Sequence, residues 1–222
     1  MKIAPSILDA DFNNLGAELE SIKTADRIHL DIMDGQYVPN LSFGAAMLKN
    51  VKFPVETEVH LMVLNPENFL DDFVKLGVKT FTFHIEATGL PRALKLLKEI
   101  KSRGILAGIS IDGYTDPDWL TDEIIELSDQ ILVMSVKSGF GGQSFMSAAV
   151  LKVEYLRSRG FSGEIEVDGG VNDENIAQIS AAGADIVVVG SFLMKKSREK
   201  RADIIKSFQE VSADCGGCCG NC

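Results

Sequence analysis

The feature that most constrains the fold is a regular alternation of short apolar segments with amphipathic segments along the chain. The apolar segments predict strands, and the amphipathic segment after each one predicts a helix. We expect strands at residues 3–8, 28–33, 55–62, 80–84, 106–111, 131–136, 164–167 and 186–189. We expect helices at residues 13–25, 43–51, 66–76, 90–103, 118–127, 148–159, 173–182 and 197–211.

Eight strand–helix units in 222 residues predict an α/β fold, the (β/α)8 or TIM barrel. Strands that are apolar throughout are typical of parallel sheets covered by helices on both faces. Eight such units fit a barrel near the lower end of its size range. A doubly wound open sheet is the alternative, but it would carry Gly-x-Gly-x-x-Gly after the first strand, and residues 6–12 lack that motif.

The cysteines divide the chain into two unequal parts. We expect a single barrel domain at residues 1–212 and a cysteine-rich tail at residues 213–222, because all four cysteines lie in the last eight residues. No disulfide framework is therefore expected in the barrel. The two Cys-x-x-Cys steps of the tail leave four interpretations open: metal capture, a thiol–disulfide switch, a site that scavenges metal clusters, or a flexible tail with incidental thiols.

Charge and hydropathy exclude several classes of function. The net charge of −10, from 32 acidic and 22 basic residues, disfavours binding to nucleic acid. The sequence contains no run of about 18 apolar residues, so no membrane span is predicted. The first residues enter a strand without a long apolar leader, so we expect a cytoplasmic protein. An anionic substrate would need a local binding site on such an acidic protein.

Polar side chains gather where the predicted strands end. His29, Asp31 and Met33 share one face of their strand because the side-chain period of a strand is two residues. His60 and Asp168 end two other strands, and barrel active sites form at these ends. Two imidazoles and two carboxylates predict one divalent ion, Zn²⁺, Fe²⁺, Mn²⁺ or Co²⁺. The remaining histidine, His84, is interpreted as structural or as a support behind the ligands.

Glycine clusters follow the last three predicted strands. They are Gly139-Phe140-Gly141-Gly142, Gly169-Gly170 and Gly190-Ser191. Loops after strands seven and eight of such barrels commonly bind phosphate, and glycine lets the backbone approach an anion closely. A metal and a phosphate site at one barrel mouth predict a small sugar phosphate as substrate.

The two carboxylates suggest the type of reaction. Asp31 could remove a proton beside a carbonyl group while Asp168 returns one to the opposite face, or the reverse. The metal would stabilise the enediolate between these steps. This chemistry is epimerisation, although the residues alone leave aldose–ketose isomerisation and aldol cleavage open.

Seven short motifs follow one another along the chain. They are Ala4-Pro5-Ser6-Ile7-Leu8, His29-Leu30-Asp31-Ile32-Met33-Asp34-Gly35, Val38-Pro39-Asn40, Val59-His60-Leu61-Met62, Met134-Ser135-Val136, Gly139-Phe140-Gly141-Gly142-Gln143 and Glu166-Val167-Asp168-Gly169-Gly170. In order and spacing they resemble the motifs of the ribulose-phosphate 3-epimerase family. The resemblance covers the chain from residue 3 to about residue 195, and only the tail lies outside it.

The resemblance implies an isomerase of the pentose phosphate pathway that interconverts D-ribulose 5-phosphate and D-xylulose 5-phosphate. It implies that Asp31 and Asp168 are the acid/base pair, that these two with His29 and His60 hold the metal, and that the protein is a homo-oligomer. It also implies a set of substrate-binding residues: Ser6 and His60 beside the sugar; Met33, Met62 and Met134 over the enediolate; and Gly139, Phe140, Gly141, Gly142, Gly169, Gly170, Gly190 and Ser191 around the phosphate.

Four places depart from the family pattern without removing a proposed ligand. Gln36 replaces the usual histidine, Glu58 a common aspartate, and Lys137-Ser138 and Asp112-Gly113 two Asn-Pro pairs. Lys137 could add a phosphate or hydroxyl contact. The alternatives are therefore an epimerase of a related ketose phosphate such as D-allulose 6-phosphate, a non-catalytic sugar-phosphate binding barrel, or a metal-handling protein that acts through its tail.

Overall fold

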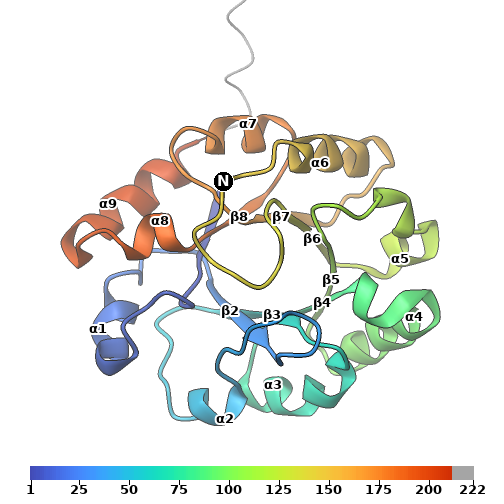
Figure 1. The fold of residues 1–222 in the computed structure, drawn as a ribbon, viewed down its shortest axis with the longest axis horizontal. Helices are drawn as coiled ribbons and strands as arrows, with labels where there is room; N and C mark the ends of the chain where they lie inside the picture. Colours follow the sequence, from blue (N-terminus) through green and yellow to red (C-terminus); the bar gives the residue numbers. More distant parts are fainter. Residues whose placement is uncertain (212–222) are drawn as a thin grey trace, which may run out of the picture.

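The sheet of the computed structural model, which describes residues 1–211, is an almost closed barrel of eight parallel strands. Figure 1 looks down this barrel, with the strands as an inner ring and the helices around them. The strands are β1 (Lys2–Pro5), β2 (Ile28–Met33), β3 (Thr57–Met62), β4 (Thr80–His84), β5 (Leu106–Ile111), β6 (Gln130–Met134), β7 (Glu164–Asp168) and β8 (Ile186–Val189). The TIM-barrel prediction is confirmed.

The helices follow the strands in the expected order. They are α1 (Leu15–Glu20), α2 (Ala45–Leu48), α3 (Leu70–Leu76), α4 (Ile85–Ser102), α5 (Asp122–Leu127), α6 (Ala148–Ser158), α7 (Ile176–Ala181), α8 (Ser191–Met194) and α9 (Arg198–Gln209). Three 3₁₀ turns precede α1, α3 and α5, at Phe12–Asn14, Pro66–Phe69 and Pro117–Trp119. None of the helices within residues 1–211 is both long and apolar enough to cross a membrane.

Several helices differ from their predicted bounds. The first two are shorter than expected, and a short helix, α8, directly follows β8. Helix α4 starts at Ile85, five residues early, and breaks at Gly89, where φ is 65° and ψ is 169°. Glycine tolerates this backbone conformation because it has no Cβ atom, and Pro91 lies in the first turn after the break, where its missing N–H leaves no helical hydrogen bond unmade. The predicted helix from residue 90 corresponds to the part of α4 after this break.

The core has two parts, separated by the barrel wall. The large cluster lies between the strands and the surrounding helices and includes Leu30, Val59 and Phe81. Inside the barrel, alternate residues of the strands point inward, and Ile186 and Val188 of β8 pack there on Ala4. On β2 the inward positions are occupied by polar groups, so the barrel interior is where the sequence departs from an apolar core.

The barrel has a seam between its first two strands. Neighbours follow the order β1-β8-β7-β6-β5-β4-β3-β2, so β1 and β2 form the two ends of the sheet. They meet through an isolated bridge between Ser6 and His29, and the Ile7 amide donates to the His29 carbonyl at 3.3 Å. Pro5 cannot donate to a ladder because it has no N–H. The seam therefore closes beside the polar residues of β2.

Candidate active site

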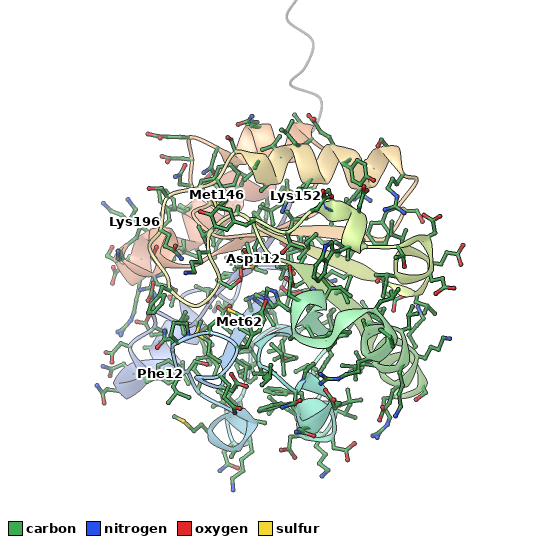
Figure 2. The ribbon with its side chains drawn as sticks, turned by 45° about the vertical axis from the view of Figure 1, so that its right-hand side comes forward. Phe12, Met62, Asp112, Met146, Lys152 and Lys196 are labelled. Atoms are coloured by element: carbon green, nitrogen blue, oxygen red, sulfur yellow. The ribbon has the colours of Figure 1, made fainter. Side chains whose placement is uncertain are left out.

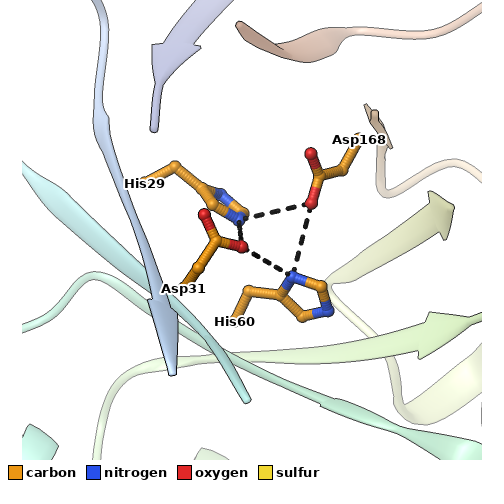
Figure 3. A group of neighbouring side chains, drawn as sticks. All are labelled: His29, Asp31, His60 and Asp168. Carbon is orange, nitrogen blue, oxygen red and sulfur yellow. Dashed lines mark ion pairs between the residues drawn. The ribbon is translucent and has the colours of Figure 1, made fainter. Parts of the chain in front are cut away.

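Four polar side chains meet at the carboxyl end of the barrel (Figure 3). His29 and Asp31 come from β2, His60 from β3 and Asp168 from β7. His29 Nε2 lies 3.5 Å from Asp31 Oδ1 and 3.7 Å from Asp168 Oδ2. His60 Nδ1 lies 3.4 Å from each of the same two oxygens. The four side chains that the sequence predicted as ligands therefore converge on one point.

These separations fit a shared cation. Ligand atoms about 2.0–2.2 Å from a tetrahedral ion lie about 3.3–3.6 Å from one another, close to the observed 3.4–3.7 Å. His29 Nε2 and His60 Nδ1 are buried and have no hydrogen-bond partner within residues 1–211. Buried polar atoms normally have one. We conclude that this group could hold a divalent metal.

In each of the two candidate ligand histidines, the ring nitrogen that faces away from the centre has a hydrogen-bond partner. The nitrogen that faces the centre is therefore available to bind a metal. His29 Nδ1 lies 3.0 Å from Glu58 Oε1. His60 Nε2 lies 2.8 Å from His84 Nε2, and His84 Nδ1 lies 3.2 Å from Glu86 Oε2. These contacts assign the proton of each ligand histidine to the nitrogen that faces away from the centre. His84 is thus a support for His60, one of the two interpretations left open by the sequence.

Electrostatics at the centre also favour a cation. Burial opposes the charge of Asp31, but His29 and His60 outweigh this effect and lower the pKa of the carboxyl group below its ordinary range. Burial likewise opposes a charge on His29, yet the facing carboxylates raise its pKa well above the ordinary value. The group therefore attracts positive charge, which a divalent ion supplies in place of a proton.

A second group of possible ligands lies deeper in the barrel and consists of His29, Glu58 and Glu166. Arg27 Nη1 is 3.0 Å from Glu58 Oε2, so a cation already faces this group. Burial and the charge of Glu58 raise the pKa of Glu166 well above its ordinary value, which disfavours a charged metal ligand there. The group of His29, Asp31, His60 and Asp168 is therefore the candidate metal centre.

We call the four candidate ligands His29, Asp31, His60 and Asp168 the metal group. A cavity of about 280 Å³ opens above it. Both carboxylates, Asp31 and Asp168, line it, whereas His29 and His60 lie buried beneath it. The other predicted site residues all line the same cavity: Ser6, Met33, Met62, Met134, Gly139, Phe140, Gly141, Gly142, Gly169, Gly170, Gly190 and Ser191. The structure thus brings together residues that are up to 185 positions apart in the sequence.

Because Ser6 bonds to only one oxygen of Asp31, the two carboxylate oxygens have different partners. Its Oγ donates to Asp31 Oδ2 at 2.5 Å, so Oδ1 is the oxygen that faces the two histidines. The Leu8 amide donates to Ser6 Oγ at 3.2 Å and fixes the hydroxyl. Ser6 therefore orients the carboxylate across the seam of the barrel.

The residues that depart from the family pattern do not line the cavity. Gln36 and Lys137 are exposed, and Ser138 Oγ donates to Asp112 Oδ2 at 2.8 Å. Lys152 of α6 points toward Asp112 (Figure 2) and donates to its carbonyl at 2.7 Å. These contacts join the loop after β5 to the glycine loop after β6, so two of the departures stabilise that loop.

Sequence reasoning did not assign nine of the residues that line the cavity: Leu8, Asp9, Val136, Gln143, Val171, Asn172, Val188, Phe192 and Lys195. Lys195 lies beside the glycines, with Nζ 3.8 Å from the position that a Cβ atom on Gly142 would occupy. A signal was present, because Lys195 follows Ser191 by one helical turn and so shares its side of α8. The predicted helix began only at residue 197, and this relation was overlooked.

The fold and this donor set define a class, a TIM barrel with a candidate metal centre beneath a cavity at the mouth of the barrel. The model of the ribulose-phosphate 3 epimerase family matches residues 2–194. The chain is 42% identical over 217 residues to ribulose-phosphate 3-epimerase of Helicobacter pylori strain J99, covering 95% of this chain and 98% of that protein. The enzyme of the same name from Escherichia coli K12 is 41% identical over 209 residues, covering 90% and 91%.

The chain belongs to the ribulose-phosphate 3-epimerase family. Among solved structures, a 3-hexulose-6-phosphate synthase superposes with a TM-score of 0.66 at 17% identity and covers 96% of this chain and 100% of its own. A phosphoribosylanthranilate isomerase from Thermotoga maritima gives 0.63 at 18% identity, covering 96% and 98%. At such identities these two matches show the barrel fold alone.

Proposed function

We propose that the chain is a metal-dependent ketose-phosphate 3-epimerase that interconverts D-ribulose 5-phosphate and D-xylulose 5-phosphate. The proposal rests on the different positions of the carboxylates and the histidines in the metal group. Asp31 and Asp168 reach the cavity, whereas His29 and His60 lie beneath it. Two carboxylates from β2 and β7 are therefore available for proton transfer, which a site that only binds metal would not need.

The proposed mechanism begins with one carboxylate ionised and the other protonated. The ionised group takes the proton from C3, and the protonated one delivers its own to the opposite face of C3, so the configuration inverts and no net proton is gained. The reverse reaction uses the same residues with their roles exchanged.

The metal would be held by His29, Asp31, His60 and Asp168. It would supply positive charge that stabilises the deprotonated sugar. Nitrogen and oxygen ligands suit Zn²⁺, Fe²⁺, Mn²⁺ and Co²⁺, and we propose one such ion per chain.

Three methionines form the proposed apolar wall near the reacting carbon. Met33, Met62 and Met134 come from β2, β3 and β6, and each is at most 4% exposed. Their thioethers offer few hydrogen bonds to water, so they would exclude solvent from the deprotonated sugar.

The phosphate would bind at the glycine-rich end of the cavity. Gly139, Gly142, Gly169 and Gly170 have positive φ values between 65° and 119°, a conformation that favours glycine. A Cβ atom on Gly170 would lie 2.7 Å from the Phe145 nitrogen, so this loop is packed too closely for a side chain. Lys195 adds a positive charge at the same end, which supports capture of an anion by an acidic protein.

The deciding experiment follows exchange of the C3 proton with solvent deuterium for D-ribulose 5-phosphate and D-allulose 6-phosphate, each with and without a chelator. We expect exchange with the pentose phosphate, its loss on chelation, and its recovery when Zn²⁺, Fe²⁺, Mn²⁺ or Co²⁺ is added. Faster turnover of allulose 6-phosphate would replace the proposed substrate. No exchange with either sugar, in protein that carries no bound metal, would contradict the epimerase proposal.

Three further expectations stay predictions: a cytoplasmic location, a homo-oligomer and the domain boundary at residue 212. Gel filtration at several protein concentrations tests the second of them. The cysteine tail at residues 213–222 lies outside the described residues.

A further inference from the structure

A buried arginine occupies the barrel interior below the metal group. Arg27 directly precedes β2 and is 6% exposed. It continues the inward-facing series of His29 and Asp31 at a spacing of two residues. A guanidinium group is seldom buried unless its donors are satisfied, so the contacts of Arg27 indicate what it does there.

The guanidinium group of Arg27 hydrogen-bonds to side chains from three strands across the barrel. Nη1 donates to Glu58 Oε2 of β3 at 3.0 Å and to Gln130 Oε1 of β6 at 2.9 Å. Nη2 donates to Glu164 Oε2 of β7 at 2.6 Å. Because the guanidinium group is planar and rigid, these three contacts fix the positions of the acceptors relative to one another.

Glu58 connects this arginine to the metal group. It is 1% exposed and pairs with His29 in the register of β2 and β3. One carboxylate oxygen, Oε2, accepts from Arg27, and the other, Oε1, lies 3.0 Å from His29 Nδ1. Each oxygen of Glu58 thus has a separate partner, with the arginine below and the ligand histidine above.

We propose that Arg27 and Glu58 are positioning residues that set the metal affinity of the site by holding His29 with its proton on Nδ1 and its Nε2 lone pair toward the metal. This inference rests on the metal centre of the proposed function. Arg27 acts two contacts away from the ligand histidine's metal-facing side, through Glu58 and then His29. Carboxylates that orient ligand histidines in this way commonly change metal affinity by about 10- to 100-fold when they are removed.

The arginine is needed because Glu58 has other neighbours inside the barrel. Glu166 Oε1 lies 3.6 Å from the same His29 Nδ1, and the Gln130 amide donates to Glu166 Oε2 at 2.5 Å. Without the guanidinium group, Glu58 Oε2 would be a buried carboxylate oxygen without its charged partner, so Glu58 would no longer be held in this orientation. His29 would then lose its defined acceptor.

The experiment compares Arg27→Met and Glu58→Gln with the full-length wild-type chain and with a matched control, Arg201→Met. Arg201 is a buried arginine bonded to Glu18 Oε2 at 2.8 Å and to the Met194 carbonyl at 2.7 Å, in the contact of α9 with α1 and α8. Its loss removes a buried ion pair of similar type outside the metal group. The Kd for Zn²⁺ is measured by calorimetric titration of metal-free protein, and Co²⁺ is added separately to record its absorption spectrum.

We expect Arg27→Met and Glu58→Gln to raise the Kd for Zn²⁺ by about tenfold or more and to change the Co²⁺ spectrum, which reports ligand geometry. Arg27→Lys should recover part of the affinity because it keeps the charge. Arg201→Met should lower thermal stability but leave the Kd within about twofold.

Folded Arg27→Met and Glu58→Gln proteins with the wild-type Kd and spectrum would overturn the inference. If Arg27→Met does not fold, Glu58→Gln decides, because glutamine can still accept from Arg27 while turning an N–H toward His29. Wild-type protein that binds no Zn²⁺ would contradict the metal centre itself and overturn both proposals. Metal binding that is normal in wild type and in both variants overturns only this inference.

Discussion

The two ends of the cavity are built in different ways. At the metal end, the groups are side chains on β2, β3 and β7, and His29 and His60 are at most 1% exposed. At the glycine end, the groups are loop backbone and partly exposed residues, and Phe140 is 52% exposed. Strands hold side chains more rigidly than loops do, so the first end suits chemistry and the second suits capture of substrate.

This difference separates the expected kinetic effects. Changes at the metal end should lower kcat, because the interactions there are made with the reacting atoms. Changes at the glycine end should raise KM, because the phosphate is held equally in the ground state and in the transition state. A variant at one end that produced the effect of the other would contradict this comparison.

The largest effect is expected for Asp168→Asn. The amide cannot transfer the proton and is a poorer metal ligand, so kcat should fall by about 1,000-fold or more. Steady-state assays give kcat and KM, and circular dichroism checks the fold. Asp173→Asn is the control, since Asp173 is exposed beyond β7 and does not line the cavity. Activity of Asp168→Asn within tenfold of wild type would exclude the proposed role.

Gly170→Ala tests the glycine end through the backbone. At φ of 65°, with a Cβ position 2.7 Å from the Phe145 nitrogen, alanine should shift the loop and raise KM by about tenfold, equivalent to about 1.4 kcal/mol. We expect little change in kcat.

Gly160→Ala is the matched control for that variant. Gly160 has a φ of 81° and an open Cβ position after α6, so it reproduces the backbone strain without the clash. It should lose stability with an unchanged KM. Equal KM values for the two variants would indicate that the loop at Gly170 does not bind phosphate.

Lys195→Ala should have a smaller effect. An exposed charge interacts weakly, so KM should rise by about threefold at low salt, and the difference should shrink as ionic strength increases. Lys196→Ala is the control because Lys196 Nζ lies 5.0 Å from the centre of the Phe192 ring and does not line the cavity. Identical KM values for Lys195→Ala and wild type at low salt would remove the lysine from the site.

Deletion of residues 213–222 should have the smallest effect. All proposed ligands lie between His29 and Asp168, so kcat and the bound metal per chain should stay within about twofold of wild type. Metal analysis and kinetics on the truncated chain test this expectation. Loss of metal from the barrel would instead favour the interpretation of the tail as a metal-handling segment.

Simple periodic rules were enough to predict that the four proposed ligands come together. The spacing of two residues placed His29 and Asp31 on one face, and the rule that barrel sites form at strand ends selected His60 and Asp168. Arg27 obeys the same spacing, but the strand was taken to start at residue 28, so its inward direction was not considered. The partners of Arg27 lie on three other strands, and their contacts depend on side-chain reach.

The glycine end was less predictable in detail. The glycine clusters were visible in the sequence, but α8 was not expected, and Lys195 was missed with it. The interpretation of Lys137 as a phosphate contact stays a prediction, since this side chain is exposed and does not line the cavity. Loop paths depend on contacts between distant segments, such as the bond from Ser138 to Asp112, which periodicity does not encode.

The seam of the barrel ties the assembly of the site to the order of events during folding. β1 pairs along its length with β8, so this ladder can form only after β8 has left the ribosome. Ser6 follows β1 directly, bridges to His29 and bonds to Asp31 across the seam. Opening the seam should cost less free energy than opening the continuous ladder. The amide hydrogen of Ile7 should therefore exchange with solvent faster than that of Ile109. The orientation of the Asp31 carboxylate is thus coupled to the weakest junction of the barrel.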